Sequence, residues 1–494
     1  MRQSFGYPNA VTRLWIVLGC LAFFGCDKKA PPAPPVVDAP GASETINGTE
    51  RIGWEQPAAD AVELAAIGDV LYVDGVRISL AGVSCAAAPT GTSPVAFACS
   101  ARLPTLTPGA HTLELASFVN DGGVLESARS SPLRVTVVPV VAPAAPVVKP
   151  ANALAAGTVV TADQARLRIE VVADGLDHPS DMAFAHDGRL FVAERSGTIR
   201  ILARQADRFG SADKRETQLP DAALSLADVM GGDGQLLSLA LDPQFDQTRF
   251  VFALYTAPAR SGEPVFTVAR FREVAGTLGD RIVLLDAIRA ASSSPKASLR
   301  FGPDAKLYAA LDEAGGAPLR GDAAAMGGLI LRLNADGTTP DDQAGATPIY
   351  ADGYGSPGGF DWDARSGALW MADHDANGSS RLRTIAPEHG APGGKTRGVS
   401  RRVYALPAAT TPSSVVAYRG RLLPAFTGSL LVASEGGRHL LRVALDPETS
   451  TRPVATERLL QDRVGGVRAV AIAPDGAVYF ATASAIGRLV PDGS

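Results

Sequence analysis

Short apolar runs separated by tight polar turns recur through the last two thirds of the chain. Each unit is an apolar strand, a turn rich in Asp, Gly or Pro, and a second apolar strand, as in DMAFAHDGRLFVAE (residues 181–194). Such runs around Asp-Gly turns are typical of β-hairpins. The unit occurs six times, beginning at residues 181, 236, 298, 358, 414 and 468. The sequence therefore predicts six hairpins.

The spacing of these units predicts how they assemble. Successive starts lie 54 to 62 residues apart, a length that suits a four-stranded propeller blade with its loops. A sheet of this kind buries its faces only against the neighbouring blades. We therefore expect residues 161–494 to form a six-bladed β-propeller, and the fold class to be all-β.

Residues 50–138 follow a different pattern, in which apolar and polar positions alternate over short runs. Turns with Asp-Gly and Pro-Gly interrupt the runs, which predicts a small antiparallel β-sandwich of about ninety residues. Trp54 and the segment LTPGAHTLEL (residues 106–115) resemble the early Trp strand and the late corner of fibronectin type III domains. We expect Trp54 and His111 to pack in the core and the corner rather than to bind a ligand.

The first 25 residues are predicted to be a signal peptide of the lipoprotein type. Arginines precede a twelve-residue apolar run, LWIVLGCLAFFG, which is shorter than the roughly twenty residues that span a bilayer and suits a secretory signal. The Gly-Cys pair at its end resembles a bacterial lipobox, in which Cys26 would carry the lipid. Cys20 is a competing processing site, and an ordinary cleaved signal or an uncleaved hydrophobic start is the other interpretation.

Two stretches rich in Pro, Ala and Val, residues 26–49 and 139–160, flank the sandwich. Their composition is typical of extended spacers without a packed core. We interpret the first as a tether and the second as an inter-domain linker. With the leader, this arrangement predicts a protein of the bacterial cell envelope, lipid-anchored in a membrane and facing the periplasm or the exterior.

Charge and cysteine content narrow the partners and the compartment. The chain has 46 Lys and Arg against 51 Asp and Glu, a net charge of −5, which is not the basic surface that binding to nucleic acid requires. Behind the leader the cysteines are Cys85 and Cys99. Because disulfides persist in exported proteins, this pair predicts one local disulfide, with two free buried thiols as the alternative.

Several ordered motifs of the propeller region carry a family resemblance. They are VVADGLDHPSDMAFAHDGRLFVAERSGTIRIL (171–202), LALDPQFDQTRFVFALYT (239–256), FGPDAKLY (301–308) and GGLILRLNADG (327–337). The chain resembles the glucose/sorbosone dehydrogenase family from about residue 168 to 492. The resemblance implies a six-bladed propeller that oxidises sugars with pyrroloquinoline quinone (PQQ), usually with Ca²⁺. In that reaction a base takes the proton of a sugar hydroxyl while the quinone accepts hydride.

The residues that the resemblance marks as functional differ in this chain. The family's catalytic histidine aligns with Ser294, and serine does not titrate near neutral pH as imidazole does. The quinone-binding Arg and Asn of a GHRNPQG segment align with Gly355 and Ser356 in GYGSPGG. A basic residue of the fifth blade aligns near Glu435. Arg468 remains from a late RxRD motif, either as a quinone contact or as a solvated cation at a strand end.

Two further sites are implied by the resemblance. A family glutamine near the second blade aligns roughly with Asp233, either at the propeller mouth or in an ordinary turn. Asp373, Asp375 and Asn377 lie in DHDANG, which matches the first half of a calcium loop with oxygen ligands. A weak Ca²⁺ site and a hydrogen-bonded loop are the two interpretations of this segment.

Two functions follow from these observations, and whether the protein is an enzyme stays open between them. The favoured hypothesis is an exported lipoprotein whose propeller has lost the catalytic base and most quinone contacts, and which binds a sugar, a glycan or an exported protein partner. The alternative is an active PQQ-dependent oxidoreductase that oxidises an aldose or a related sugar. A propeller mouth is a preformed concave site, so it suits binding with or without chemistry.

Overall fold

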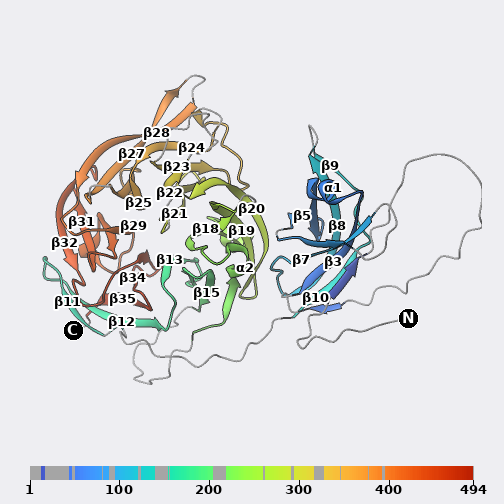
Figure 1. The fold of residues 1–494 in the computed structure, drawn as a ribbon. Coiled ribbons are helices and arrows are strands. Elements are labelled where there is room, and N and C mark those ends of the chain that lie inside the picture. The colour runs from blue at the N-terminus through green and yellow to red at the C-terminus, as the bar shows by residue number, and fades with distance from the viewer. Residues whose placement is uncertain are drawn as a thin grey trace, which may run out of the picture. The chain divides into compact units, whose positions relative to one another are not determined.

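The structure is a computed structural model of the 494-residue chain. It describes residues 13–16, 44–46, 50–80, 82–87, 95–120, 124–138, 154, 156–203, 219–259, 262–290, 294–315, 327–344, 347–375, 378–391 and 395–492. Contacts divide the chain into two compact units, residues 1–144 with 277–282, and residues 145–276 with 283–494. The first contains the predicted sandwich and the second the predicted propeller (Figure 1).

The smaller unit is built from two β-sheets. One sheet has the order β1 (Arg13–Ile16), β3 (Arg51–Ala58), β7 (Val95–Arg102), β6 (Ser84–Ala87). The other has the order β2 (Glu44–Ile46), β10 (Leu133–Val137), β8 (Gly109–Asn120), β4 (Ile67–Val73), β5 (Val76–Ser79), with β9 (Val124–Glu126) on β8. A short helix, α1 (Ala61–Ala66), connects β3 to β4, and the Asp60 side chain caps its first turn.

The core of this unit confirms two predictions. Trp54 is fully buried among aliphatic side chains, and His111 is buried with its ring nitrogens 2.7 Å from Asp74 Oδ2 and 2.8 Å from the carbonyl oxygen of Thr107. Cys85 and Cys99 are cross-strand partners of β6 and β7 and form the predicted disulfide. Both residues that resembled fibronectin positions are therefore packing residues.

The larger unit is a six-bladed β-propeller, assembled in the described ranges as follows. Blade 1 is β13 (Pro179–Phe184), β14 (Leu190–Glu194), β15 (Thr198–Leu202) and β16 (Ala222–Ser225). Blade 2 is β17 (Leu236–Leu241), β18 (Phe250–Pro258), β19 (Pro264–Val274) and β20 (Thr277–Ala290). Blade 3 is β21 (Ala297–Phe301), β22 (Leu307–Gly315), β23 (Gly327–Leu333) and β24 (Ile349–Tyr354), and β20 also pairs with β22.

The second half of the ring repeats this arrangement. Blade 4 is β25 (Ser356–Trp362), β26 (Leu369–His374), β27 (Ser380–Ala391) and β28 (Lys395–Ala405). Blade 5 is β29 (Pro412–Ala417), β30 (Ser429–Ser434), β31 (His439–Leu445) and β32 (Pro453–Leu459). Blade 6 is β33 (Ala469–Ile472), β34 (Val478–Ala481), β35 (Ala485–Pro491), β12 (Arg166–Asp174) and β11 (Gly157–Val160). The six predicted hairpins are the first two strands of the six blades.

The ring closes through its first and last strands. β12 pairs antiparallel with β35, from Leu167 opposite Pro491 to Asp174 opposite Ala485. Leu167 and Ile169 of β12 are buried in the same core cluster as Leu489 of β35. Because a strand from the beginning of the propeller completes the last blade, the ring cannot open without breaking this ladder.

The innermost strand of each blade forms its ladder on one edge, so its other edge faces the propeller axis. Polar side chains on these strands accept backbone N–H groups of the next blade. The pairs are Asp181 with Leu239 (3.2 Å), Ser238 with Leu299 (2.9 Å), Asp361 with Ala417 (2.8 Å), and Ser414 with Val470 (3.4 Å). The backbone N–H groups of the next blade need acceptors, which explains why a Ser or Asp interrupts otherwise apolar inner strands.

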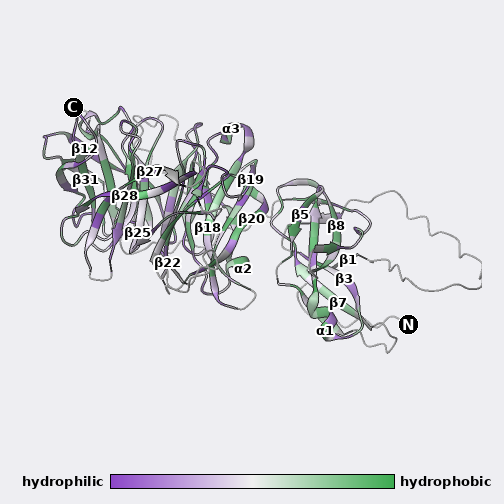
Figure 2. Ribbon diagram, turned by 90° about the horizontal axis from the view of Figure 1, so that it is seen from above, coloured by the Kyte–Doolittle hydropathy of each residue, from purple (hydrophilic) through white to green (hydrophobic). Residues whose placement is uncertain are grey.

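Hydropathy follows the same architecture in Figure 2, where hydrophobic strands run through the propeller and hydrophilic residues gather in its loops. In the described ranges, no helix combines the length and apolar character needed to cross a membrane. The predicted signal peptide overlaps β1, and the predicted lipid site Cys26 and its competitor Cys20 lie outside the described residues. Their roles stay predictions.

Candidate functional site

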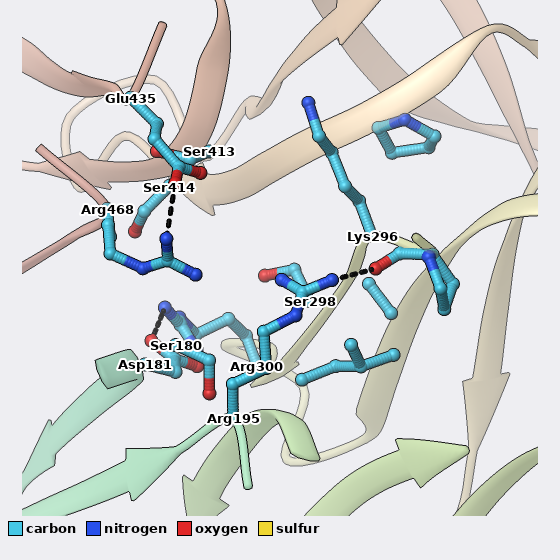
Figure 3. A pocket seen from close by; sticks show the side chains of 14 residues that line it. Ser180, Asp181, Arg195, Lys296, Ser298, Arg300, Ser413, Ser414, Glu435 and Arg468 are labelled. Atoms are coloured by element: carbon cyan, nitrogen blue, oxygen red, sulfur yellow. Dashed lines mark hydrogen bonds and ion pairs between the residues drawn. The ribbon is translucent and has the colours of Figure 1, made fainter. Parts of the chain in front are cut away.

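The beginnings of the inner strands surround a small cavity of about 50 Å³ at one end of the propeller axis (Figure 3). We call the following lining residues the cationic mouth: Arg195, Lys296, Arg300, Arg468, Asp181, Glu435, Ser180, Ser298, Ser413 and Ser414. Four of them are basic and two are acidic, so the mouth has two positive charges in excess. The charge excess exists although the whole chain is acidic.

An ion pair across the axis forms the floor of the mouth. Arg300 of β21 donates from Nη1 and Nη2 to the Asp181 carboxylate of β13 at 2.7 and 3.0 Å. The side chains are only 17% and 5% exposed. Burial alone would lower the pKa of Arg300, but the charge of Asp181 and its hydrogen bonds raise it above the usual value. The guanidinium of Arg300 therefore stays charged.

Ser294, which aligns with the family's histidine, lies beside the mouth and contacts one of its lining residues, Arg195. Arg195, directly after β14, donates to Ser294 Oγ and to the carbonyl oxygen of Pro295, both at 3.2 Å. Its Nε donates to Gln235 Oε1 at 2.8 Å. Ser294 thus accepts a hydrogen bond from a permanent cation, and no imidazole is among the residues that line the described cavity.

Arg195 has no carboxylate partner among the described residues. Burial lowers its pKa, and the nearby charge of Arg468 lowers it further, while Glu435 acts in the opposite sense. Lys296, directly before β21, is half-buried, and within the described part of the chain its ammonium group has neither a hydrogen-bond nor an ion-pair partner. These two side chains account for the excess positive charge.

The opposite wall holds an arginine with its counterion. Arg468, directly before β33, donates from Nη1 to Glu435 Oε1 and from Nε to the carbonyl oxygen of Pro179 at 3.1 Å. The Arg468 side chain is 10% exposed and the Glu435 side chain 47%. Sequence reasoning identified both positions, and the structure brings them together in the mouth. The pairing also gives Arg468 a structural partner.

Asp233 lies elsewhere. It is exposed in the turn after α2 (Ala227–Met230) and is not among the residues that line the described cavity. Gln235, two residues later, instead contacts the mouth through Arg195. Sequence reasoning missed Gln235, Arg195 and Lys296. Their position in the blades was the available signal. Arg195 directly follows the second strand of its blade, as Glu435 does in blade 5. Lys296 directly precedes an inner strand, as Arg468 does in blade 6.

The predicted calcium residues are engaged by arginines. Asp373, at the end of β26 and 1% exposed, accepts from Arg383 Nε at 2.9 Å. Asp375 lies 2.6 Å from Arg381 Nη2 and accepts the backbone N–H of Ser379. Asn377 is outside the described residues. No group of three or more His, Cys, Asp or Glu suited to a metal ion occurs in the ranges that the structure describes.

A wider cavity of about 720 Å³ lies at the other end of the axis, among the ends of the inner strands. Its charged groups are paired within the protein. Arg419 donates to Asp361 Oδ1 at 2.7 Å, Arg300 binds Asp181, and Asp363 accepts from the backbone and hydroxyl of Ser366. Both arginines that line this cavity therefore have aspartate partners, unlike Arg195 in the mouth.

Comparison with known proteins gives a consistent result. The family model described as Glucose / Sorbosone dehydrogenase matches residues 176–491. An aldose sugar dehydrogenase of Escherichia coli K12, YliI, is 25% identical over 363 residues, which are 66% of this chain and 92% of the relative. An uncharacterised Synechocystis protein, slr1608, is 26% identical over 373 residues, 67% of this chain and 88% of the relative.

Solved structures agree on the fold. A putative oxidoreductase (glucose dehydrogenase) of Thermus thermophilus superposes with a TM-score of 0.52 at 28% identity, covering 66% of this chain and all of that one. The PQQ-bound aldose sugar dehydrogenase of Streptomyces coelicolor gives a TM-score of 0.52 at 22% identity, covering 69% of this chain and 99% of that one. The family model covers the propeller and leaves the sandwich unmatched.

Proposed function

Because the chain belongs to the glucose/sorbosone dehydrogenase family, whose fold supports sugar oxidation, we propose that it is a propeller of that family that binds its ligand without oxidising it. The observation that carries this proposal is the environment of Ser294. A general base needs a lone pair aimed at the substrate and a pKa near the working pH. Ser294 lacks such a pKa, since its hydroxyl titrates far above neutrality, and one of its lone pairs accepts from Arg195.

The other polar groups of the mouth do not replace the missing base. Asp181 is buried below Arg300, and Glu435 binds Arg468. Each carboxylate therefore already holds the hydrogen bonds of a guanidinium. A substrate hydroxyl would have to displace Arg300 to reach Asp181, and at Glu435 it would meet a carboxylate that already binds Arg468.

The family's cofactors fit the residues of this chain poorly. The two candidate calcium carboxylates of DHDANG that the structure describes are neutralised by Arg381 and Arg383. The mouth leaves about 50 Å³, whereas sites for small molecules and cofactors usually offer roughly 300–1,000 Å³. The positive charge of the mouth would suit an acidic quinone. Its volume is too small for one, however, and no histidine is among the lining residues of the described cavity.

An activity assay tests the proposal. The purified protein is incubated with PQQ and Ca²⁺ and assayed with an artificial electron acceptor and a panel of aldoses, beside the E. coli relative as a positive control. We expect no sugar-dependent reduction by this protein. Saturable, sugar-dependent turnover would overturn the proposal and establish the alternative, an active PQQ-dependent oxidoreductase.

We further propose that the protein is a lipoprotein of the cell envelope. The lipobox-like Gly-Cys pair and the Pro-rich stretch behind it support this. Cys26→Ala should move the protein from the membrane fraction to the soluble fraction, while Cys20→Ala should leave it membrane-bound. The opposite result would place the processing site at Cys20. The partner would then be a sugar, a glycan or another exported protein in the same compartment.

A further inference from the structure

The cationic mouth holds more buried positive charge than its own carboxylates balance. Arg300 and Arg468 have carboxylate partners. Among the described residues, the guanidinium of Arg195 and the ammonium group of Lys296 have none, although the backbone N–H of Lys296 donates to Asp312. Burying a charge without a counterion is costly, and the nearby charge of Arg468 repels the partly buried guanidinium of Arg195. An anionic ligand would relieve both costs.

The chemistry of the mouth narrows the kind of anion. Four serine side chains line the same cavity, and two of them, Ser180 and Ser413, donate to backbone carbonyls and keep lone pairs for a ligand. The volume of about 50 Å³ has room for about three or four water-sized groups. A carboxylate with one or two hydroxylated carbons fills such a space, and a whole fused-ring cofactor does not.

We propose that the cationic mouth binds the carboxylate end of an acidic saccharide, with Arg195 and Lys296 as its direct charge partners. This inference rests on the proposed non-catalytic function and names its ligand. The carboxylate accepts from the guanidinium and the ammonium, and the adjacent sugar hydroxyls face the serines. The shared chemistry is a hydroxylated carboxylate, which a free hexuronate and the terminal uronate of a polysaccharide both carry.

Glu435 gives the site an internal competitor. Its carboxylate is attached to Arg468, yet its side chain is 47% exposed, and it follows β30 in a loop rather than lying within a strand. It can therefore turn outward while Arg468, held by the carbonyl of Pro179, keeps its place. The negative charge of Glu435 acts on Arg195 and would repel a ligand carboxylate bound there.

Calorimetric titration of the full chain with glucuronate, galacturonate and a uronate-terminated oligosaccharide tests the proposal, with glucose as the neutral arm. We expect binding of the acidic sugars that weakens with added salt, and none of glucose. Binding of the oligosaccharide alone would assign the polysaccharide end as the source. Arg195→Met and Lys296→Met should each weaken binding about tenfold, because a charge-assisted hydrogen bond is lost.

Glu435→Gln is the most informative variant. It removes the competing negative charge, so it should tighten binding of the acidic sugar several-fold, whereas most changes to a lining residue weaken binding. A weaker or unchanged affinity would overturn the role of Glu435. Arg419→Met, at the other end of the axis, is the matched control and should leave affinity unchanged. If Arg195→Met fails to fold, the affinity of the Glu435→Gln variant for the acidic sugar still tests the proposal. Equal binding of glucose, or no binding of any acidic sugar, refutes the inference, whereas quinone-dependent turnover refutes the proposed function.

Discussion

The ion pair between Arg300 and Asp181 predicts a large loss of stability when the arginine is removed. Arg300→Met keeps a long, flexible side chain but leaves Asp181, 5% exposed, with neutral donors only. Ser238 and the backbone N–H groups of Met182 and Leu239 still reach its oxygens. Breaking a buried pair from one side costs about 3–5 kcal/mol, and the bidentate contact at 2.7 and 3.0 Å favours the upper half of that range.

Arg419→Met is the matched comparison within the same ring. It also removes the arginine partner of an axial aspartate, Asp361, which keeps the backbone N–H groups of Trp362 and Ala417. The Arg419 side chain is 48% exposed, so water replaces much of what is lost. We expect a cost of about 1 kcal/mol or less.

Differential scanning calorimetry of the full chain measures both variants. Because the chain has two compact units, the propeller transition must be assigned before a free energy is taken from it. Arg300→Met should lower that transition by several degrees and Arg419→Met by much less, with the sandwich transition unmoved. Equal shifts for the two variants would refute the reasoning, since exposure would then have no influence on the cost of the missing partner.

Three further predictions concern the two units separately. Removing the disulfide by Cys85→Ala with Cys99→Ala should lower the free energy of unfolding of the sandwich by about 3 kcal/mol, the value for a loop of this length, and leave the propeller transition in place. Burial raises the pKa of Asp69 above its usual 3.8, so the folded state holds this proton more tightly than the unfolded state and stability falls as pH rises past that value. Asp69→Asn should therefore stabilise the sandwich at pH 7 and lose this advantage below about pH 4, as measured by urea unfolding at both pH values. A chain that starts at residue 154 keeps β12 and should give a monomeric propeller by size-exclusion chromatography, whereas a start at residue 176 removes the ring-closing strand and should aggregate.

The parts of the fold that the sequence predicted are local. Each inner hairpin is encoded by two apolar runs and a turn, and the disulfide joins neighbouring strands of one sheet. Turn chemistry explains one detail: Gly188 and Gly476 adopt φ of 86° and 91° at equivalent hairpin turns, and Ala305 takes φ of 57° where glycine would be easier. Ring closure by β12 was not predicted, because pairing across more than 300 residues leaves no periodic signal.

The candidate site was predicted only in part for the same reason. Motif comparison reached Ser294, Glu435 and Arg468, because the family defines those positions. It could not reach Arg195, whose contact with Ser294 spans 99 residues. The cationic character of the mouth is a property of the closed ring, since its basic residues come from the ends of strands in three different blades.

Ion pairs divide this end of the propeller into two parts. In one part the carboxylates are paired with arginines of the same chain, and in the other part cations lack a carboxylate partner among the described residues. On the side of blades 4 to 6, the carboxylates at the family's functional positions bind arginines of the same chain, as Glu435 does with Arg468. A carboxylate oxygen that is paired in this way gains nothing from a ligand unless the ligand offers more than the partner it displaces. On the side of blades 1 to 3, the guanidinium of Arg195 is met only by neutral groups in the described chain. The carboxylate of Asp312 accepts from the backbone N–H of Lys296, not from its ammonium group. In the function proposed here, the mouth keeps an unbalanced positive charge without a catalytic base, and the sign of that charge favours an anionic ligand.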